Sequence, residues 1–281
     1  MSTNDHLSNR IHAVPGTAAP TLQDLLSVAM DAAYLAGRRT LAYFNTRLAV
    51  ELKADKTPVT QADREAEEII RTCILRNFPD HSILGEEGGT IDANPDYRWI
   101  IDPIDGTKSF VCGVPLYGVL IAVEVQQSAA VGVVYMPALD EMVSAATGLG
   151  CRWNGRVARV STVSRLADAA VMASSITTAM ARSSAFEILA GKTRLQRTWG
   201  DCYGYVLVAT GRAEVMLDSV IHPWDIAPML PIIREAGGRF TDWSGKPSIW
   251  SQDAVASNGE LHESVLQILK SETPKTRPDR S

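Results

Sequence analysis

Trp99-Ile100-Ile101-Asp102-Pro103-Ile104-Asp105-Gly106-Thr107 is the most informative stretch of this sequence. Its three leading apolar residues predict a buried strand, and that strand ends abruptly in two aspartates. A carboxylate such as Asp102 is costly to bury unless a cation or hydrogen bonds compensate its charge. Asp105 follows across a turn that a proline anchors, so both carboxylates can reach one point. The stretch therefore predicts a strand that ends in a charged site.

The residues after these aspartates indicate what the site binds. The amides of Gly106 and Thr107 are free to bind an anion if a helix or nest opens there. Carboxylates beside free amides suit a hard divalent cation together with a phosphate. Oxygen ligands of this kind favour Mg²⁺ or Mn²⁺ over zinc.

Two other segments present carboxylates in turns. Leu84-Gly85-Glu86-Glu87-Gly88-Gly89 predicts a short strand running into a glycine-rich turn. Pro223-Trp224-Asp225 puts an aspartate at the start of a predicted helix. The three acidic segments together are much less expected by chance than any one of them.

Each acidic residue also has a purely structural interpretation. Asp102 with its proline can initiate a turn, the Glu86-Glu87 pair can be solvated surface, and Asp225 can be a helix N-cap. Asp63, three residues after Thr60, fits a capping box as well as a metal role. The residues by themselves leave these alternatives open.

Outward from this centre, the first third of the chain predicts helices. Apolar residues from Leu22 to Ala36 recur at helical spacing, and Thr21 with Asp24 resembles a capping box. A second helix is expected over 61–78, before Pro79. Residues 49–59, rich in lysine and aspartate, predict an extended stretch between the two helices.

The middle of the chain predicts a meander of antiparallel strands. Asn154-Gly155 is a strong hairpin signal, because a type I′ turn needs positive φ at both central residues. The apolar runs that indicate strands are Trp99–Ile101, Leu116–Val125, Ala130–Met136 and Met142–Ala146.

Beyond about residue 165, strands and helices alternate. Strands are expected near Val171, at 196–199, at 214–217, at 239–242 and near Val255, and helices at 179–190, 202–210, 225–235 and 260–270. Within the helix expected at 225–235, Pro231 removes an interior hydrogen bond and predicts a kink.

This order of elements predicts an α+β or α/β layered sandwich with alternating helix and sheet layers. We expect a flexible tail over 1–20 and a second tail over 276–281. Between them, 21–165 is expected to form a helix pair and an antiparallel sheet that carry most of the site. Residues 166–275 are expected to form an α/β subdomain that carries Asp225.

Composition sets wider limits on function. The chain has 281 residues, 46% of them hydrophobic, and a formal net charge of −5, which is typical of a globular protein and argues against a nucleic-acid binder. Its four cysteines have neither metal-ligand spacing nor a C-x-x-C pair, which indicates reduced thiols in the cytoplasm. The longest apolar run, Val114 to Val123, is about half of what a membrane span needs.

The three acidic segments resemble the signatures of the inositol monophosphatase-like Mg²⁺-dependent phosphatases. The matching patterns are G-E-E at 85–87, W-I-I-D-P-I-D-G-T at 99–107 and W-D at 224–225, in that order. The resemblance implies two or three Mg²⁺ ions, which Mn²⁺ can replace. The metal ligands that it implies are Glu86, Asp102, the main-chain carbonyl of Ile104, Asp105 and Asp225.

The resemblance also implies a reaction. Asp63 and Thr107 would orient and deprotonate an attacking water, with Glu86 beside them, while the amides of Gly106 and Thr107 hold the phosphate. Lys53, Asp55 and the 57–63 segment resemble a mobile loop near a third metal. Direct attack by water is expected, because no G-x-S-x-G elbow and no P-loop occurs.

The choice of phosphomonoester depends on two shorter segments. Lys108-Ser109-Phe110 and residues 197–205 look most like the histidinol-phosphate phosphatase branch. Asp201 and Asp218 would offer negative charge to a cationic leaving group, although Asp201 can also cap a helix that begins at Cys202.

Three hypotheses follow. The first is a cytoplasmic, homodimeric histidinol-phosphate phosphatase of histidine biosynthesis, acting on a small phosphorylated metabolite. The second is an inositol-1-phosphate, sugar-phosphate or nucleotide phosphatase with the same metal site. The third is a metal-binding dimer without catalysis, which would require a broken ligand set.

Overall fold

The computed structural model describes residues 19–46, 49–52 and 58–271. Most of the expected tail over 1–20, the whole of 276–281, and Lys53, Asp55 and Thr57 lie outside these residues. The helices are α1 Leu22–Leu41, α2 Gln61–Asn77, α3 Thr107–Val111, α4 Ile176–Arg182, α5 Ala185–Lys192, α6 Asp201–Ala209, α7 Pro223–Ile226, α8 Met229–Glu235 and α9 His262–Ser271, with a 3-10 turn at Leu166–Asp168.

The strands fall into three sheets. A small sheet pairs β1 Val50–Leu52 with β2 Pro58–Thr60. The eight-stranded sheet contains β3 His81–Gly85, β4 Gly89–Ile91, β5 Asn94–Asp105, β6 Gly118–Val125, β7 Ser128–Met136, β8 Glu141–Ala146, β9 Gly150–Trp153 and β10 Arg156–Val157. The five-stranded sheet contains β11 Ala170–Ala173, β12 Leu195–Arg197, β13 Val215–Asp218, β14 Arg239–Thr241 and β15 Ala254–Ser257.

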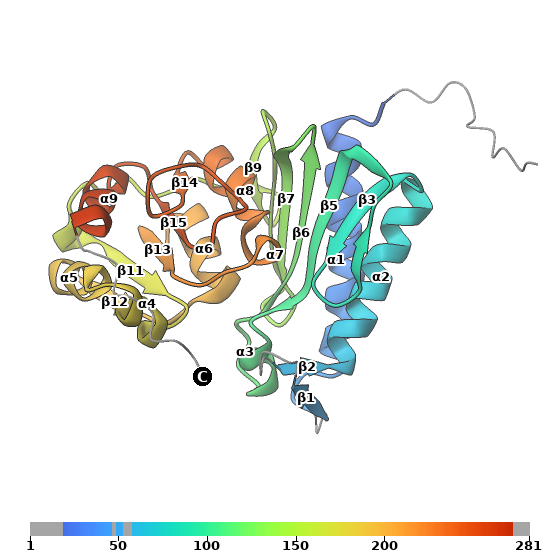
Figure 1. The fold of residues 1–281 in the computed structure, drawn as a ribbon, viewed down its shortest axis with the longest axis horizontal. Coiled ribbons are helices and arrows are strands. Elements are labelled where there is room, and N and C mark those ends of the chain that lie inside the picture. Colours follow the sequence, from blue (N-terminus) through green and yellow to red (C-terminus); the bar gives the residue numbers. More distant parts are fainter. Residues whose placement is uncertain (1–18, 47–48, 53–57, 272–281) are drawn as a thin grey trace, which may run out of the picture.

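The two large sheets and the helices alternate in five layers (Figure 1). Helices α1 and α2 cover one face of the eight-stranded sheet, where alternate residues such as Trp99, Ile101 and Val119 are buried. The other face shares a core with α6 and α8, through Ile100 and Leu120. This arrangement confirms the layered sandwich expected from the sequence. The division at residue 165 stays a prediction.

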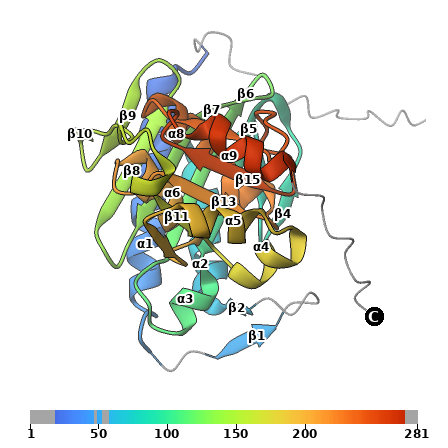
Figure 2. The same cartoon turned by 90° about the vertical axis from the view of Figure 1, so that its left-hand side faces the viewer.

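Helices α6 and α8 lie between the sheets, and α5 and α9 close the outer face of the five-stranded sheet (Figure 2). The strands of this sheet bury both faces: Met172 and Met216 face α6 and α8, whereas Val171 and Val215 pack with α5 and α9. Both faces are therefore apolar.

The expected antiparallel meander is correct for β5 to β10 but wrong for β3. The hairpin at Asn154-Gly155 has φ of 46° and 77°, as a type I′ turn requires. Strand β3, however, runs parallel to β5, with Gly85 opposite Ile101. The reason is that β4 intervenes in the sequence and turns back along the other side of β3.

The N-terminal helices begin where the sequence predicts. Thr21 and Asp24 form a capping box at the start of α1, and Thr60 and Asp63 form another at α2. The helix expected over 179–190 is instead divided into α4 and α5, because Ser183 is extended and its hydroxyl accepts a hydrogen bond from Ala185 N–H at 3.1 Å.

The kink expected at Pro231 is also wrong. Helix α7 ends at Ile226, and α8 begins after Pro228. Pro231 therefore lies in the first turn of α8, where a missing N–H costs no intrahelical hydrogen bond. The break between α7 and α8 separates Asp225 from the longer helix.

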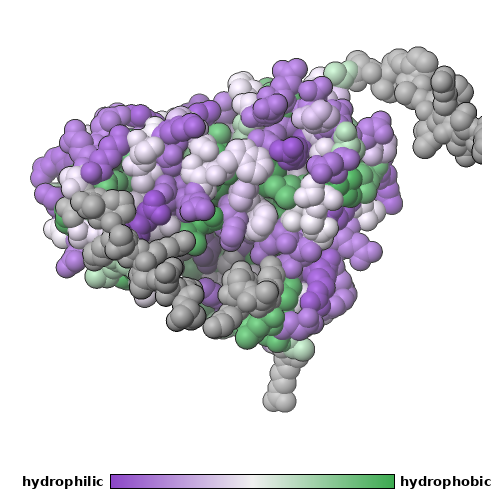
Figure 3. Space-filling model, in the orientation of Figure 1, coloured by the Kyte–Doolittle hydropathy of each residue, from purple (hydrophilic) through white to green (hydrophobic). Residues whose placement is uncertain are grey.

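Polar residues cover most of the face drawn in Figure 3, and apolar residues form small separate patches on it. No helix among the described residues is long and apolar enough to cross a membrane. All four cysteines are free.

Candidate metal centre

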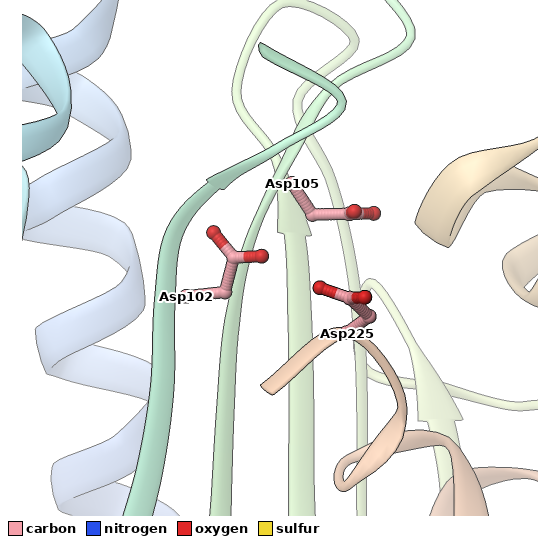
Figure 4. Close-up of side chains that lie close together, drawn as sticks. All are labelled: Asp102, Asp105 and Asp225. Atoms are coloured by element: carbon pink, nitrogen blue, oxygen red, sulfur yellow. The ribbon is translucent and has the colours of Figure 1, made fainter. Parts of the chain in front are cut away.

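Three aspartates meet where β5 ends beside α7. Asp102 and Asp105 come from β5, and Asp225 comes from α7 (Figure 4). One carboxylate oxygen of each lies within 4.8 Å of the others. Asp102 is 1% exposed. The structure therefore brings together three aspartates that the sequence nominated from segments more than 100 residues apart.

The shape of β5 explains why two of its aspartates face one point. The pairing of β5 with β6 is regular up to Asp102 and shifts before Asp105, which lies opposite Gly118. Such an irregularity changes the direction of the side chains that follow it. Asp102 Oδ1 accepts a hydrogen bond from Ile104 N–H at 3.0 Å, which fixes the turn.

The electrostatics of the cluster favour a cation. Burial, followed by the charges of Glu86, Asp105 and Asp225, raises the pKa of Asp102 well above its ordinary value. Burial and the neighbouring acids likewise raise the pKa of Asp225 to about 8, against a hydrogen bond from His222 N–H. Such mutual repulsion is what a divalent cation relieves. The donors are all oxygens, so the residues fit Mg²⁺ or Mn²⁺.

Asp225 is held by its own helix. Its Oδ2 accepts a hydrogen bond from His222 N–H at 2.7 Å, as the third residue of α7. The N-cap interpretation is therefore wrong in detail, because the helix begins two residues earlier, at Pro223. One oxygen caps the helix, and the cluster still includes this carboxylate.

The two acids expected at the leaving group line the same cavity as the cluster. This small cavity of about 60 Å³ is bordered by Asp105, Ser174, Asp201, Tyr205, Asp218, Val220, Ile221 and Asp225. Asp218 accepts a hydrogen bond from Tyr205 O–H at 2.8 Å, and burial raises its pKa to about 7.

Asp201 does not cap a helix that begins at Cys202. Helix α6 begins at Asp201 itself, with Gly200 as its N-cap residue, and Asp201 has a φ of 49°. Its N–H donates to Ser174 Oγ at 2.7 Å. The N–H of Cys202 donates to Asp105 Oδ2, so the start of α6 is tied to the aspartate cluster.

Two other nominated acids, Glu86 and Asp63, are not among the three carboxylates that meet within 4.8 Å. The charge of Glu86 acts on Asp102, Asp225 and Asp63, since it contributes to the raised pKa of all three. Asp63 is 1% exposed, and its Oδ2 accepts from Thr60 N–H at 2.8 Å and from the Thr60 hydroxyl at 2.6 Å.

The segment after the cluster also has the expected start of a helix. Gly106, with a φ of 81°, is the N-cap residue of α3, which begins at Thr107. The hydroxyl of Thr107 donates to the carbonyl oxygen of Ile104 at 2.9 Å. The first amides of a helix have no acceptor within the helix.

Sequence reasoning missed Ser174 and Tyr205, which line the cavity. Ser174 belongs to no motif, whereas Tyr205 ends the segment 197–205, whose family resemblance assigns no role to this tyrosine. Ser174 directly follows β11, and Asp218 ends β13, which runs parallel to β11. The carboxyl ends of parallel strands meet at one edge, so a correct strand prediction could have paired these two positions.

A buried cluster of oxygen donors between layered sheets fits the class of metal-dependent enzymes. Residues 21–273 match the model of the inositol monophosphatase family. The chain belongs to this family and is a phosphoric monoester hydrolase.

Individual relatives agree with this assignment. The chain is 44% identical over 248 residues to a histidinol-phosphatase of Chlorobaculum parvum, covering 87% of this chain and 96% of the relative. It is 40% identical over 234 residues to a histidinol-phosphatase of Streptomyces coelicolor, covering 79% and 87%. A solved structure of an IMPase from Thermotoga maritima superposes with a TM-score of 0.81 and 34% identity, covering 88% of this chain and 97% of that one.

Proposed function

We propose that this protein hydrolyses L-histidinol phosphate to L-histidinol and phosphate by direct attack of water. The observation that carries the choice of substrate is the cavity, in which Asp201 and Asp218 lie with two aspartates of the cluster. A leaving group at the mouth of this cavity faces acidic side chains, which suits a cationic amine and imidazole. The relatives named histidinol-phosphatases support the same choice.

We propose Asp102, Asp105, Asp225, Glu86 and the carbonyl oxygen of Ile104 as ligands of two or three Mg²⁺ ions. The chemistry that Mg²⁺ supplies when bound is neutralisation of the carboxylates, polarisation of the phosphoryl oxygens and easier deprotonation of water. The carbonyl oxygen has two lone pairs, so it can accept from Thr107 and still serve as a ligand.

Thr107 and Asp63 are proposed to orient the nucleophilic water and to help deprotonate it. Because Thr107 donates its own proton to the Ile104 carbonyl, its Oγ1 is left to accept a hydrogen bond from water. Burial raises the pKa of Asp63. Both hydrogen bonds from Thr60 go to its Oδ2, so Oδ1 is the oxygen proposed to accept from the water. The amides of Gly106 and Thr107 are proposed to hold the phosphate at the start of α3.

Phosphate release tests the proposal directly. The purified protein is assayed with L-histidinol phosphate, inositol 1-phosphate, fructose 1,6-bisphosphate and adenosine 3′,5′-bisphosphate, each with and without EDTA. We expect the highest kcat/KM for histidinol phosphate and no turnover in EDTA. Equal or better turnover of inositol 1-phosphate would refute the substrate, and activity that resists the chelator would refute the metal mechanism.

The second candidate substrate is inositol 1-phosphate, which the likeness to the Thermotoga maritima IMPase favours. The same assay separates the two, because inositol carries no cation for Asp201 and Asp218 to attract.

We further infer that the enzyme works as a homodimer in the cytoplasm. The four free cysteines fit a reducing compartment. Light scattering of the purified chain tests the dimer, and a mass of one chain at micromolar concentration would contradict it.

A further inference from the structure

Glu67 is a buried carboxylate on α2, one helical turn after Asp63, and has no part in the proposed reaction. It is 2% exposed. Its Oε2 accepts a hydrogen bond from Glu87 N–H at 2.8 Å, and its Oε1 accepts from Gly88 N–H at 2.7 Å. A single helix side chain therefore holds two consecutive amides of the turn between β3 and β4.

Arg71 completes this attachment. Its Nε lies 2.7 Å from Glu67 Oε1, an ion pair at i,i+4 spacing on α2, and its Nη2 donates to the carbonyl oxygen of Gly89. Burial of a carboxylate without such a partner is strongly unfavourable. The pair thus contacts the backbone at residues 87, 88 and 89 in succession.

The glycines of the turn make room for the pair. A Cβ atom built on Gly85 or Gly88 would overlap the Glu67 carboxylate and the Arg71 guanidinium. Both positions therefore need glycine because a charged pair from another element fills the space beside them. This explains the glycines at 85 and 88, whereas Gly89 has a positive φ of 68° and nothing within 4 Å of its Cβ position.

The held turn carries Glu86. Gly85 lies opposite Ile101 in the parallel pairing of β3 and β5, and Glu86 N–H donates to the Ile101 carbonyl at 3.3 Å. The next residues along the two strands are Glu86 and Asp102. The position of the turn therefore decides where the Glu86 carboxylate lies relative to the aspartate cluster.

We propose that Glu67, supported by Arg71, is a positioning residue for Glu86. It fixes the turn so that the Glu86 carboxylate is already beside Asp102 when a divalent cation arrives, and it thereby sets the affinity for that cation. This inference rests on the proposed function, which makes Glu86 a metal ligand. Glu67 itself touches neither metal nor substrate.

Calorimetric titration of the full-length, metal-free protein with Mg²⁺ tests the proposal. Glu67→Gln keeps the size of the side chain but loses its charge and one of its two acceptor oxygens. We expect it to weaken Mg²⁺ binding about 10- to 100-fold, as loss of a group that orients a ligand does. Glu68→Gln is the matched control, because Glu68 is the next residue on α2 and is exposed.

Two further measurements separate positioning from a merely structural role. In kinetics, the Mg²⁺ concentration for half-maximal rate should rise by the same factor, while kcat at saturating Mg²⁺ changes much less. In thermal unfolding, Glu67→Gln should lose more stability in Mg²⁺ than in EDTA, whereas structural damage alone would lower both equally.

A second variant covers the case in which Glu67→Gln does not fold. Gly88→Ala displaces the Glu67 carboxylate without removing its charge, and we expect weaker Mg²⁺ binding in the same direction. Unchanged Mg²⁺ affinity in folded Glu67→Gln or Gly88→Ala, with normal binding by the wild type, would overturn this inference alone. Failure of the wild type to bind Mg²⁺ would overturn the proposed function and this inference together.

Discussion

Asp102 is the most buried residue of the aspartate cluster, and its replacement gives the clearest test of the site. Asp102→Asn keeps the shape and the hydrogen bond from Ile104 N–H, but it removes a ligand charge. We expect kcat to fall more than about 100-fold, beyond the usual effect of a residue that only orients a ligand. Steady-state kinetics with saturating Mg²⁺ measure this. Circular dichroism should show an intact fold, and a near-normal rate would contradict the metal role.

Replacement of Asp218 tests the choice of substrate rather than the hydrolytic step. In Asp218→Asn the amide oxygen can still accept the hydrogen bond from Tyr205 O–H. At pH 8, where a carboxyl group with a pKa of about 7 is mostly ionised, loss of the charge should raise KM for histidinol phosphate about 10-fold or more with little change in kcat, as removal of uniform binding does. Asp168→Asn is the control, since that side chain is 57% exposed on the surface. An unchanged KM would remove Asp218 from the substrate site.

The sequence was informative at the cluster because its carboxylates stand beside turn-forming residues, and the resemblance to a known family favoured a metal site over the structural alternatives. Asp102, Asp105 and Asp225 could be nominated from turn-forming neighbours, and the structure brings them together. Ser174 could not, because a serine after a strand is common, and Tyr205 was part of the segment 197–205 but had no role assigned to it. Ser174 lies near Asp218 because β11 and β13 pair in parallel, and Tyr205 comes from α6; both placements are properties of the fold.

At the level of elements, the spacing of apolar residues predicted the N-terminal helices well. It did not predict where a helix is interrupted. The face of α1 was readable because its small and apolar residues recur at helical spacing. The break at Ser183 depends on a side-chain hydrogen bond to the backbone of Ala185, which competes locally with the helix. The parallel pairing of β3 with β5 depends on β4 joining the far side of β3, and no local pattern encodes this.

Two glycines in helices should respond in opposite ways to alanine. A Cβ on Gly37 of α1 would lie 2.5 Å from Tyr135 Cδ1 and 2.8 Å from Pro137 Cγ, whereas nothing lies within 4 Å of a Cβ on Gly191 of α5. Gly37→Ala should therefore destabilise the protein by about 1–3 kcal/mol through overpacking of α1 against β7. Gly191→Ala should stabilise it by up to about 1 kcal/mol. Urea unfolding measures both, and equal effects would contradict the packing described for α1.

His262 links the stability of the whole molecule to pH. At the start of α9, its two ring nitrogens lie 2.8 Å from Ser257 Oγ and 3.1 Å from Thr241 Oγ1, so it joins the helix to β14 and β15. Burial, followed by the charge of Arg239, lowers its pKa to about 4, with Lys270 acting in the same direction and Glu263 against it.

The sign of the effect follows from the two states. Below pH 6.5 the unfolded chain binds a proton at this histidine, whereas the folded chain binds one only near pH 4. The free energy of unfolding should therefore fall between pH 6.5 and 4, by up to about 3 kcal/mol from this residue. Urea unfolding of the wild type and His262→Gln in EDTA at several pH values measures the difference. A difference between the two that does not vary with pH in this range would contradict the prediction.

Removal of the metal should lower the stability of the whole molecule, because its proposed ligands come from the eight-stranded sheet and from α7. Asp102 and Asp105 end a strand of the eight-stranded sheet, and Asp225 lies on α7, after the third strand of the five-stranded sheet along the chain. A cation bound only by the folded chain adds about 2.7 kcal/mol at 100 times its Kd. For a chain of 281 residues, with an unfolding entropy of about 2.1 cal/mol/K per residue, we expect Tm to be about 4–5 °C higher in Mg²⁺ than in EDTA. Differential scanning calorimetry measures this shift, and Asp102→Asn should reduce it. The same Tm in Mg²⁺ and EDTA for the wild type would mean that the aspartates meet without holding a cation.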